Sequence, residues 1–290
     1  MDKNVFVIIV SYNGERWLKK NLEALEASLY PVSTIVIDNK SSDNSVAIAQ
    51  SFPSVKVLAL NSNLGFGKAN NIGLKMALEQ QADYVFLLNQ DAWVFPETIG
   101  NLVQASQAHT NFGVLSPLHY SGDGIHLDEN FKTYWERKTS SLDKYLDEVP
   151  FVNAAAWLLP IDVIKKVGYF EPLFSHYGED RNYCDRILYH NFKIGVLSSS
   201  KICHDRTISR SFKKDLVQSK FLLLTEVLNI NQTLFAAYFK TFHKVVGLPK
   251  YFKKYYSVKQ TCQFFFVLLW YYMLLKLHIF TVVKSRKSYR

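Results

Sequence analysis

The chain is poor in cysteine. Its 290 residues include three, Cys184, Cys203 and Cys262, and no two of them have the close spacing of zinc ligands. This odd, scattered set fits reduced thiols in the cytosol better than a disulfide framework. The apolar run Val5–Val10 is too short for a signal peptide and lacks a small-residue cleavage site. We therefore expect a cytoplasmic protein.

Two common nucleotide-binding signatures are also missing. The turn after the first apolar run, Ser11–Gly14, holds one glycine where a dinucleotide-binding turn needs three. The later segment Gly65–Gly67 does not follow the first strand, so it does not complete that fingerprint. No G-x-x-x-x-G-K-[ST] loop occurs in the sequence. These absences argue against nicotinamide-dependent oxidoreductases and P-loop NTPases.

Acidic residues are scarce at one end of the chain. Residues 201–290 contain 17 lysines and arginines against 3 aspartates and glutamates, whereas residues 1–200 contain 17 against 22. The net charge of +9 therefore combines a body at −5 with a C-terminal region at +14. Such asymmetry predicts docking on an anionic partner. Nucleic acid is not the partner we expect, because no binding module is recognisable and the aromatic residues cluster apart from the cations.

The same region is unusually apolar. Within Thr261–Val283 only Lys276 and His278 interrupt the run, which is long enough for a bilayer span. Basic residues flank it on both sides: Lys250, Lys253, Lys254, Lys259, Lys284, Arg286, Lys287 and Arg290. Aromatic helices with basic flanks are typical of segments that lie in the interface of an anionic membrane, which is the interpretation we favour. A helical cap or dimer-forming face and a true transmembrane span are the alternatives.

The first 90 residues alternate between strands and helices. Apolar runs at Val5–Val10 and Ala82–Leu88 have the composition of buried strands, and Thr34–Ile37 and Val55–Leu60 are predicted as the second and third strands. Helical segments with short connections lie between them, which predicts an α/β fold with a mainly parallel sheet. Polar residues follow each strand: Ser11, Tyr12 and Asn13; Asp38 and Asn39; Asn61 and Asn63; Asn89, Gln90 and Asp91.

Four consecutive polar strand ends predict a site. The carboxyl ends of parallel strands form the crevice in which such sheets bind ligands. Asp91 is the candidate cation ligand there, because carboxylate oxygens suit a divalent cation that would itself hold phosphate oxygens. The alternative for Asp91 is a simple turn, since Asn and Asp often follow strands by bonding their own backbone.

Beyond Asp91 the alternation loosens, and two further clusters become candidates. Glu179 and Asp180 stand at the predicted start of a helix, where the helix dipole favours carboxylates. Alternatively, one of them is a general base that faces Asp91 across the crevice. His204 is either an ordinary packed histidine or a second ligand for the cation. We also predict the following elements: a helix at 96–108, strands at 112–115, 151–159 and 193–197, and a surface excursion at 121–146.

Five motifs occur in a familiar order: V-S-Y-N at 10–13, I-D-N at 37–39 with S-S-D at 41–43, N-L-G-F-G-K-A-N-N-I-G at 63–73, L-N-Q-D at 88–91 and Y-G-E-D at 177–180. Together they resemble family 2 glycosyltransferases with the GT-A fold, especially the bacterial rhamnosyltransferase-like branch. The resemblance covers about residues 4–210.

This resemblance implies the organisation and the reaction. Residues 1–210 would form a Rossmann-like GT-A domain, with a nucleotide-sugar half to about 95 and an acceptor half from about 96. Residues 211–290 would be a helical, basic and aromatic extension that associates with a membrane or oligomerises as a homodimer. The expected reaction is inverting transfer of a single sugar, with rhamnose as the sugar to test first. The donor would be a nucleoside-diphosphate sugar and the acceptor a growing, lipid-linked bacterial surface glycan. The enzyme would sit peripherally at the inner face of the cell membrane.

The resemblance also assigns residues. Asp180 matches the catalytic base, with Glu179 its neighbour. Asp91 and His204 match positions that hold a divalent cation, Mn²⁺ or Mg²⁺. Asn153 and Trp157 fall where acceptor-binding residues lie. The donor-binding positions are Ser11, Tyr12, Asn13, Asp38, Asn39, Asn63, Gly65, Phe66, Asn70 and Asn89.

One departure from the family pattern bears on metal binding. Asn89 replaces the first Asp of the D-x-D motif, so the cation would meet one carboxylate there.

The absence of Q-x-x-R-W argues against a processive synthase. Two other functions stay open: a sugar-nucleotide pyrophosphorylase, although the basic glycine-rich loop it needs is missing after the first strand, and a non-catalytic, membrane-docked nucleotide-binding scaffold.

Overall fold

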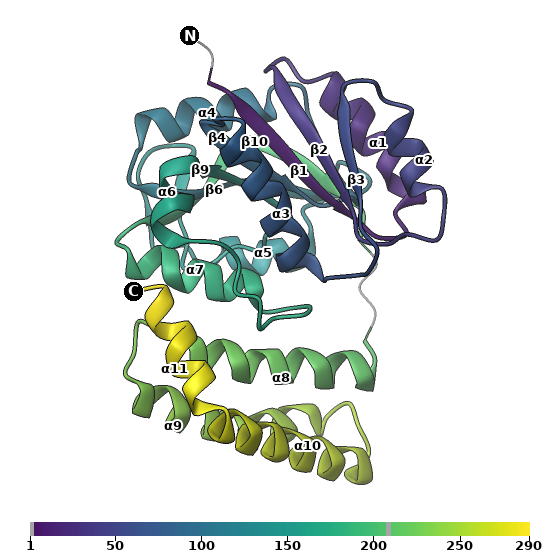
Figure 1. Ribbon diagram of the computed structural model, residues 1–290. Helices are drawn as coiled ribbons and strands as arrows, with labels where there is room; N and C mark the ends of the chain where they lie inside the picture. Colours follow the sequence, from purple (N-terminus) through teal and green to yellow (C-terminus); the bar gives the residue numbers. More distant parts are fainter. Residues whose placement is uncertain (1–2, 207–209) are drawn as a thin grey trace.

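A ten-stranded sheet with helices on both faces forms the body of the molecule, and a layer of helices lies beneath it (Figure 1). The computed structural model describes residues 3–206 and 210–290. The strand order is β3-β2-β1-β4-β9-β6-β10-β8-β7, and β5 pairs with β10 off this path.

The N-terminal half of the sheet is parallel, as predicted. Its strands are β1 (Val5–Ser11), β2 (Val32–Asp38), β3 (Val55–Ala59) and β4 (Tyr84–Leu88). Their connections run through α1 (Glu15–Glu26), α2 (Ser45–Gln50) and α3 (Phe66–Glu79). In the register of β1 and β2, Ser11 lies beside Asp38, so two of the predicted polar strand ends are neighbours.

The C-terminal half of the sheet is mixed. It contains β5 (Ala92–Val94), β6 (Phe112–Ser121), β7 (Ser140–Ser141), β8 (Leu146–Glu148), β9 (Ala156–Pro160) and β10 (Lys193–His204). The strand predicted at 151–159 begins only at Ala156 and runs antiparallel to β4. The strand predicted at 193–197 continues to His204, because its second half pairs with β5 and β6. The helices of this half are α4 (Thr98–Ala108), α5 (Glu129–Trp135), α6 (Ile161–Val167) and α7 (Glu179–Tyr189).

The segment predicted as a surface excursion is partly structural. Asp128 caps α5 by accepting a hydrogen bond of 2.8 Å from the backbone nitrogen of Phe131. The ring of Phe131 is fully buried in the core on one face of the sheet. This helix therefore belongs to the body, because a buried aromatic anchors it.

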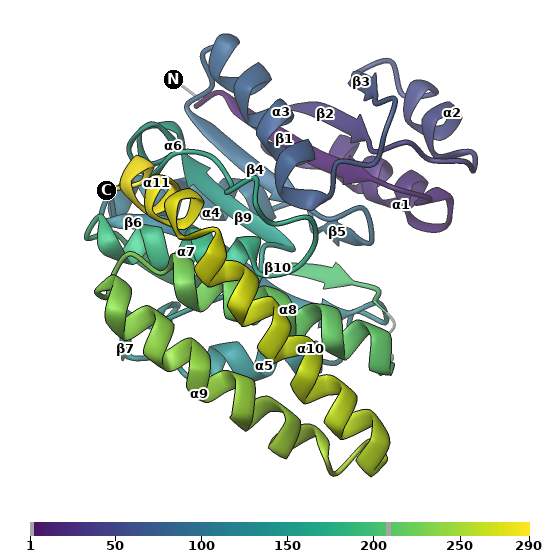
Figure 2. The ribbon, with the colours of Figure 1, turned by 60° about the horizontal axis from the view of Figure 1, so that its bottom comes forward.

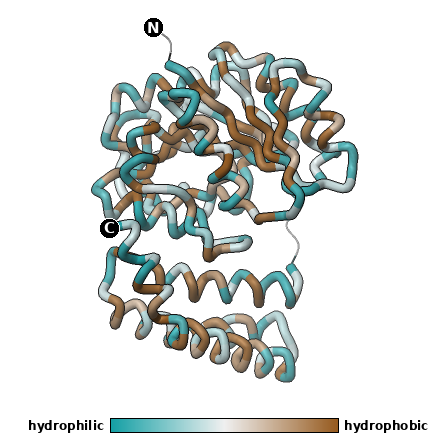
Figure 3. The backbone as a smooth tube through the Cα atoms, in the orientation of Figure 1, coloured by the Kyte–Doolittle hydropathy of each residue, from teal (hydrophilic) through white to brown (hydrophobic). Residues whose placement is uncertain are grey.

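Alternation along β1 divides the core into two layers. Phe6 and Ile8 face one layer, and Val5, Val7 and Ile9 face the other. The strands of the central sheet form the hydrophobic interior seen in Figure 3. Close-packed side chains therefore cover both faces of the sheet, and they hold the strand ends in fixed positions.

The C-terminal helices have a core of their own. They are α8 (Phe212–Leu228), α9 (Leu234–Phe252), α10 (Val258–Leu277) and α11 (Ile279–Ser288). α8 packs against α7, whereas α9 and α10 pack on α8 from below (Figures 1 and 2). Phe174, from the loop before α7, is buried in this core, and Arg286 of α11 donates to the carbonyl oxygens of Val227 and Asn229. The extension is thus bound to the body at the loop that precedes Glu179.

Within the described residues, no helix alone is long and apolar enough to cross a membrane. α10 and α11 taken together meet that criterion by length and composition, but they are bent by 70° relative to each other.

Candidate active site

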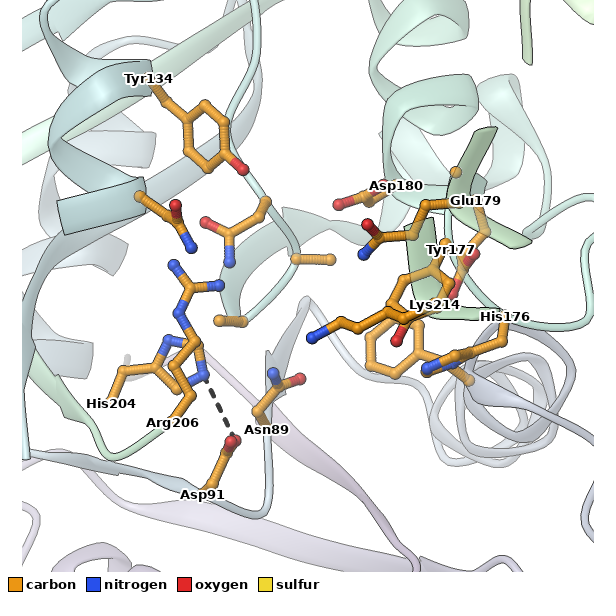
Figure 4. Close-up of a pocket in the computed structure, with 17 residues that line it drawn as sticks. Asn89, Asp91, Tyr134, His176, Tyr177, Glu179, Asp180, His204, Arg206 and Lys214 are labelled. Carbon is orange, nitrogen blue, oxygen red and sulfur yellow. Dashed lines mark ion pairs between the residues drawn. The ribbon is translucent and has the colours of Figure 1, made fainter. Parts of the chain in front are cut away.

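A cavity of about 470 Å³ opens between the sheet and the C-terminal helices. Its lining includes the end of β4, the segment before β9, the start of α7 and the end of β10. Asn89 and Asp91 lie on one side, next to His204 and Arg206, and Glu179 and Asp180 lie on the other (Figure 4). The cavity therefore contains the predicted cation ligands and the predicted base together.

Asp91 and His204 form a pair. The Nε2 atom of His204 lies 3.3 Å from Oδ1 of Asp91. The backbone holds them there, because the backbone nitrogen of Asp205 donates to the carbonyl oxygen of Asp91 at 2.8 Å and extends the contact between β5 and β10. The ring of His204 is almost fully buried, and its other nitrogen, Nδ1, lies 3.8 Å from a carboxylate oxygen of Asp128.

Asp128 also orients the guanidinium group of Arg206 at the edge of the cavity. The guanidinium of Arg206 donates from Nε and Nη2 to the two carboxylate oxygens, at 2.7 and 2.5 Å. Burial acts to raise the pKa of Asp128, but the hydrogen bonds from Arg206 and from the backbone of Phe131 hold it below its usual value. The carboxylate is therefore charged, and a two-pronged contact of this kind sets the orientation of Arg206.

The acidic pair begins α7. Gly178 precedes it in a left-handed conformation with φ of 89°. Glu179 is 5% exposed, and its Oε2 has no hydrogen-bond partner within the described part of the chain. Burial, followed by the charge of Asp180, raises the pKa of Glu179 to about 7. Burial also raises the pKa of Asp180, whose Oδ1 accepts a hydrogen bond of 2.7 Å from the backbone nitrogen of Arg181.

The predicted donor residues at β2 and β3 form one interlocked loop cluster. Asp38 accepts hydrogen bonds from Ser41, and the amide of Asn39 donates to Oδ1 of Asn63 at 2.9 Å. The same Asn63 oxygen accepts from the backbone nitrogen of Gly65 at 2.9 Å. These side chains therefore hold the two loops against each other at one edge of the sheet.

A second set of bonds ties the end of β1 to the end of β4. The side-chain amide of Gln90 accepts from the backbone nitrogen of Tyr12 at 2.8 Å and donates to its carbonyl oxygen at 3.2 Å. Asn13 accepts from the backbone nitrogen of Ser42. The hydroxyl of Ser11 is buried and has no partner among the residues that the structure describes. The motif residue Gln90 thus has a structural role, which the sequence did not reveal.

The next donor segment approaches the loop before α7. Gly65 has φ of 81°, and a Cβ there would lie 1.9 Å from the carbonyl oxygen of Ser175. Phe66 lines the cavity, whereas Asn70 is buried and donates to the carbonyl oxygen of Phe66. Of the ten predicted donor residues, Phe66 and Asn89 line this cavity, and the other eight are not among its lining residues.

The two predicted acceptor residues differ in position. Asn153 lines the cavity, and its buried Oδ1 has no partner within residues 3–206 and 210–290. Trp157 does not reach the cavity. It lies on β9, is fully buried, and stacks on Phe170 with the ring planes 17° apart. Strand alternation directs this side chain into the core, so our prediction that it contacts an acceptor is not supported.

Sequence reasoning missed part of the cavity lining. Tyr134 comes from α5, His176 from the loop before α7, and Lys214 and Gln218 from α8. Arg206 follows the candidate ligand His204 by two residues, and that spacing was the one signal for it. The contribution of α8 means that the C-terminal extension is part of the site as well as an appendage to it.

The model of glycosyl transferase family 2 matches residues 6–168, more than half of the chain. The chain belongs to this family. Among curated relatives, dTDP-rhamnosyl transferase RfbF of Shigella flexneri is 26% identical over 213 residues, covering 70% of each chain. N-acetylglucosaminyl-diphospho-decaprenol L-rhamnosyltransferase of Mycobacterium tuberculosis is 24% identical over 234 residues, covering 70% of this chain and 76% of the relative. The predicted rhamnosyltransferase-like family membership is confirmed.

Solved structures place this glycosyltransferase in the GT-A fold. The mannosyltransferase PcManGT from Pyrobaculum calidifontis, in complex with GDP-Man and Mn²⁺, aligns with a TM-score of 0.63 at 12% identity, covering 96% of this chain and 88% of that one. Residues 1–349 of S. aureus TarS, in complex with UDP, align with a TM-score of 0.61 at 17% identity, covering 90% and 77%. The predicted fold is therefore confirmed, and the family match confirms the predicted enzyme class.

The side chains of this glycosyltransferase can supply only part of the coordination shell of a divalent cation. Within the described ranges, no cluster of three or more His, Cys, Asp and Glu side chains could hold a metal. Asp91 and His204 nevertheless offer one carboxylate oxygen and one imidazole nitrogen 3.3 Å apart. Such a pair suits a cation that takes its remaining ligands from phosphate oxygens and water, as Mg²⁺ commonly does.

Proposed function

We propose that this glycosyltransferase transfers a single sugar, with inversion, from a nucleoside-diphosphate sugar to a lipid-linked acceptor in bacterial surface glycan synthesis. The names of the two curated relatives support rhamnose as the sugar and a polyprenyl-diphosphate-linked sugar as the acceptor class. The observation that carries the proposal is the placement of Asp180 opposite Asp91 and His204 in one cavity.

The donor would lie along the parallel strand ends. Ser11, Tyr12, Asn13, Asp38 and Asn39 would surround the nucleoside, because they gather at the carboxyl ends of β1 and β2. Asn63, Gly65, Phe66, Asn70 and Asn89 would shape the path from the nucleoside to the cavity. The buried, unpartnered hydroxyl of Ser11 supports this placement, since a buried polar atom without a partner on the chain commonly serves a ligand.

The diphosphate would meet two kinds of positive charge. Asp91 and His204 would hold a divalent cation, Mn²⁺ or Mg²⁺, which offsets the negative charge that the leaving nucleoside diphosphate gathers. Arg206 supplies a second, permanently charged group at the same end of the cavity. Its fixed orientation on Asp128 means that little rearrangement is needed when the diphosphate arrives.

The acceptor hydroxyl would lose its proton to Asp180. This carboxylate borders the cavity, and its raised pKa makes it a stronger base than an exposed aspartate. Burial raises the pKa of Glu179 to about 7, so below that pH this side chain is largely protonated and adds little negative charge beside Asp180. Asn153 would orient the acceptor from the segment before β9. One base acting opposite the leaving group inverts the anomeric centre, whereas a covalent intermediate would need a nucleophile as well.

The proposed reaction is tested by incubating the purified enzyme with a panel of nucleotide sugars, dTDP-rhamnose first, and a short-chain polyprenyl-diphosphate N-acetylglucosamine. We expect a disaccharide product whose anomeric configuration, read by nuclear magnetic resonance, is opposite to that of the donor. A retained configuration would contradict the single-base mechanism. Release of pyrophosphate from a nucleoside triphosphate and a sugar phosphate would indicate a pyrophosphorylase, and donor binding without turnover on any acceptor would indicate a scaffold.

We also propose that the enzyme works peripherally at the inner face of the cell membrane. The acceptor class supports this location, and so does the basic character of residues 211–290, which carry 14 lysines and arginines against 2 acids. A homodimer formed through the extension is the competing proposal.

A further inference from the structure

The outer sides of α9 and α10 carry two exposed apolar stripes. On α9 the stripe consists of Phe235, Phe239, Phe242 and Val246, and on α10 of Phe266, Trp270, Met273 and Leu277. Both sets recur at intervals of four, three and four residues, so each occupies one face of its helix. We call the two stripes together the aromatic face. Phe235 is 82% exposed and Trp270 is 65% exposed, although side chains of this kind are normally buried.

The aromatic face points away from the catalytic body. The opposite sides of α9 and α10, which include Val245 and Leu268, pack with α8 in the helical core. Figure 2 shows the two helices side by side in front of α8, and Figure 3 shows their hydrophobic stretches. Between them runs an apolar groove of about 680 Å³, lined by Phe235, Phe239, Phe242 and Met273 among others.

The charge around this face has one sign. Residues 211–290 contain two acids, Asp215 and Glu226, and each contacts a cation within the protein, Arg210 at 2.9 Å and Lys244 at 3.0 Å respectively. Exposed basic residues stand at the α9–α10 turn and around the other end of α10: Lys250, Lys253, Lys254, Lys259, Lys276, Lys284 and Lys287.

We infer that the aromatic face is the surface on which this enzyme docks on an anionic bilayer, with its apolar side chains in the interfacial layer and a lipid hydrocarbon chain in the groove. Exposed aromatic side chains with lysines around them suit the boundary between headgroups and acyl chains. A second copy of the chain is a poorer occupant. In a two-fold dimer the same strongly basic surface would face itself, and the charges would repel each other.

The inference deepens the proposed function, because it orients the cavity toward a lipid-linked acceptor. α8 contributes Lys214 and Gln218 to the cavity and packs against α9 and α10. The cavity and the aromatic face are thus separated by two layers of helix, or about 20 Å. The headgroup end of an acceptor anchored in the bilayer would have to extend over that distance along the extension.

Vesicle flotation of the full chain tests the docking surface without any catalytic step. We expect binding to vesicles of phosphatidylglycerol and phosphatidylethanolamine, and much weaker binding to phosphatidylcholine. Phe235→Ser with Phe239→Ser should lower the partition coefficient about tenfold or more, because two exposed phenylalanines no longer enter the interface. Lys250→Glu with Lys259→Glu should lower the partition coefficient at least fivefold per substituted residue on anionic vesicles and should leave binding to phosphatidylcholine vesicles unchanged.

The matched control changes apolar residues that are equally exposed on the catalytic body. Leu29→Ser with Ile125→Ser removes side chains that are 79% and 73% exposed and should leave vesicle binding unchanged. Brominated acyl chains should quench Trp270, the one tryptophan of residues 211–290, and this quenching should vanish in Trp270→Phe. Circular dichroism and the melting temperature confirm that each variant is folded.

Three results would overturn the inference. The Phe235→Ser, Phe239→Ser variant could bind vesicles as strongly as the wild type, or the control variant could lose as much binding as this variant does. Alternatively, light scattering could show that the wild-type protein is a dimer and that this variant is a monomer. Transfer to a short-chain, water-soluble acceptor separates this inference from the proposed reaction. If the variant loses vesicle binding and keeps that transfer, the docking surface is supported. If the wild type docks as expected and transfers no sugar, the reaction is wrong and the surface stands.

Discussion

Glu179→Gln is expected to stabilise the protein in a pH-dependent manner. The Glu179 side chain is 5% exposed, and its Oε2 has no hydrogen-bond partner among the described residues. Burial and the neighbouring charge of Asp180 raise its pKa from the usual 4.5 to about 7. At about 1.4 kcal/mol per pH unit, ionising the buried carboxyl costs about 3 kcal/mol relative to the unfolded chain.

The sign follows from proton binding. Between pH 4.5 and about 7 the folded protein holds a proton on Glu179 that the unfolded chain has lost. The contribution of this group to the free energy of unfolding therefore falls as the pH rises through that window and is constant above and below it. Glutamine does not titrate, so in Glu179→Gln this position adds no pH dependence to the free energy of unfolding. The difference in free energy of unfolding between Glu179→Gln and wild type should thus grow by about 3 kcal/mol between pH 4 and pH 8.

Urea unfolding at pH 4, 6 and 8 measures this difference directly. Glu97→Gln, an exposed glutamate before α4, serves as the control and should show no such growth. Because Glu179 is protonated below about pH 7, Glu179→Gln removes no charge beside Asp180 in that range, so the acid limb of the pH–rate profile should stay near its wild-type position. A constant difference in stability across the three pH values would refute the buried-charge account of Glu179.

Three further substitutions test other parts of the site. Asp91→Ala should weaken donor binding mainly when Mn²⁺ or Mg²⁺ is present, and an unchanged metal titration would count against Asp91 as a ligand. Arg206→Lys keeps the charge but loses the two-pronged geometry, so the KM for the donor should rise about tenfold; Arg16→Lys, at an ion pair 69% exposed on the arginine side, should leave that KM unchanged. Gly65→Ala should lower the free energy of unfolding by about 1–3 kcal/mol, because the residue needs a positive φ and has no room for a Cβ. If Gly65→Ala unfolds at the same urea concentration as the wild type, the backbone around residue 65 moves to make room for the Cβ and the predicted cost is wrong.

The parallel half of the fold was accessible from the sequence for a physical reason. Strands such as Val5–Ser11 are buried on both faces, so they appear as unbroken apolar runs, and polar residues mark where each strand ends. The same property brought Asp91 into the candidate site. The position of Asp180 across from it needed the family resemblance, because no local pattern shows which carboxylate at a helix start faces a cavity.

Other features depend on tertiary pairing that a single sequence does not display. β10 extends to His204 because β5 and β6 pair with it, and neither pairing has a local signal. Trp157 faces the core because of the phase of β9, which a run of apolar residues leaves undetermined. Arg206 and Asp128 meet across 78 positions of the sequence, so their hydrogen bonds could be seen only in the structure.

The most direct test of the account is the turnover of Asp180→Asn with saturating donor and acceptor, measured beside the donor dissociation constant of the same variant. We expect turnover to fall by at least about a hundredfold, because a general base is removed. The donor dissociation constant should stay near the wild-type value, because the proposed mechanism has Asp180 contact the acceptor and not the donor. Near-normal turnover in a correctly folded variant would show that another group takes the proton and would contradict the proposed site.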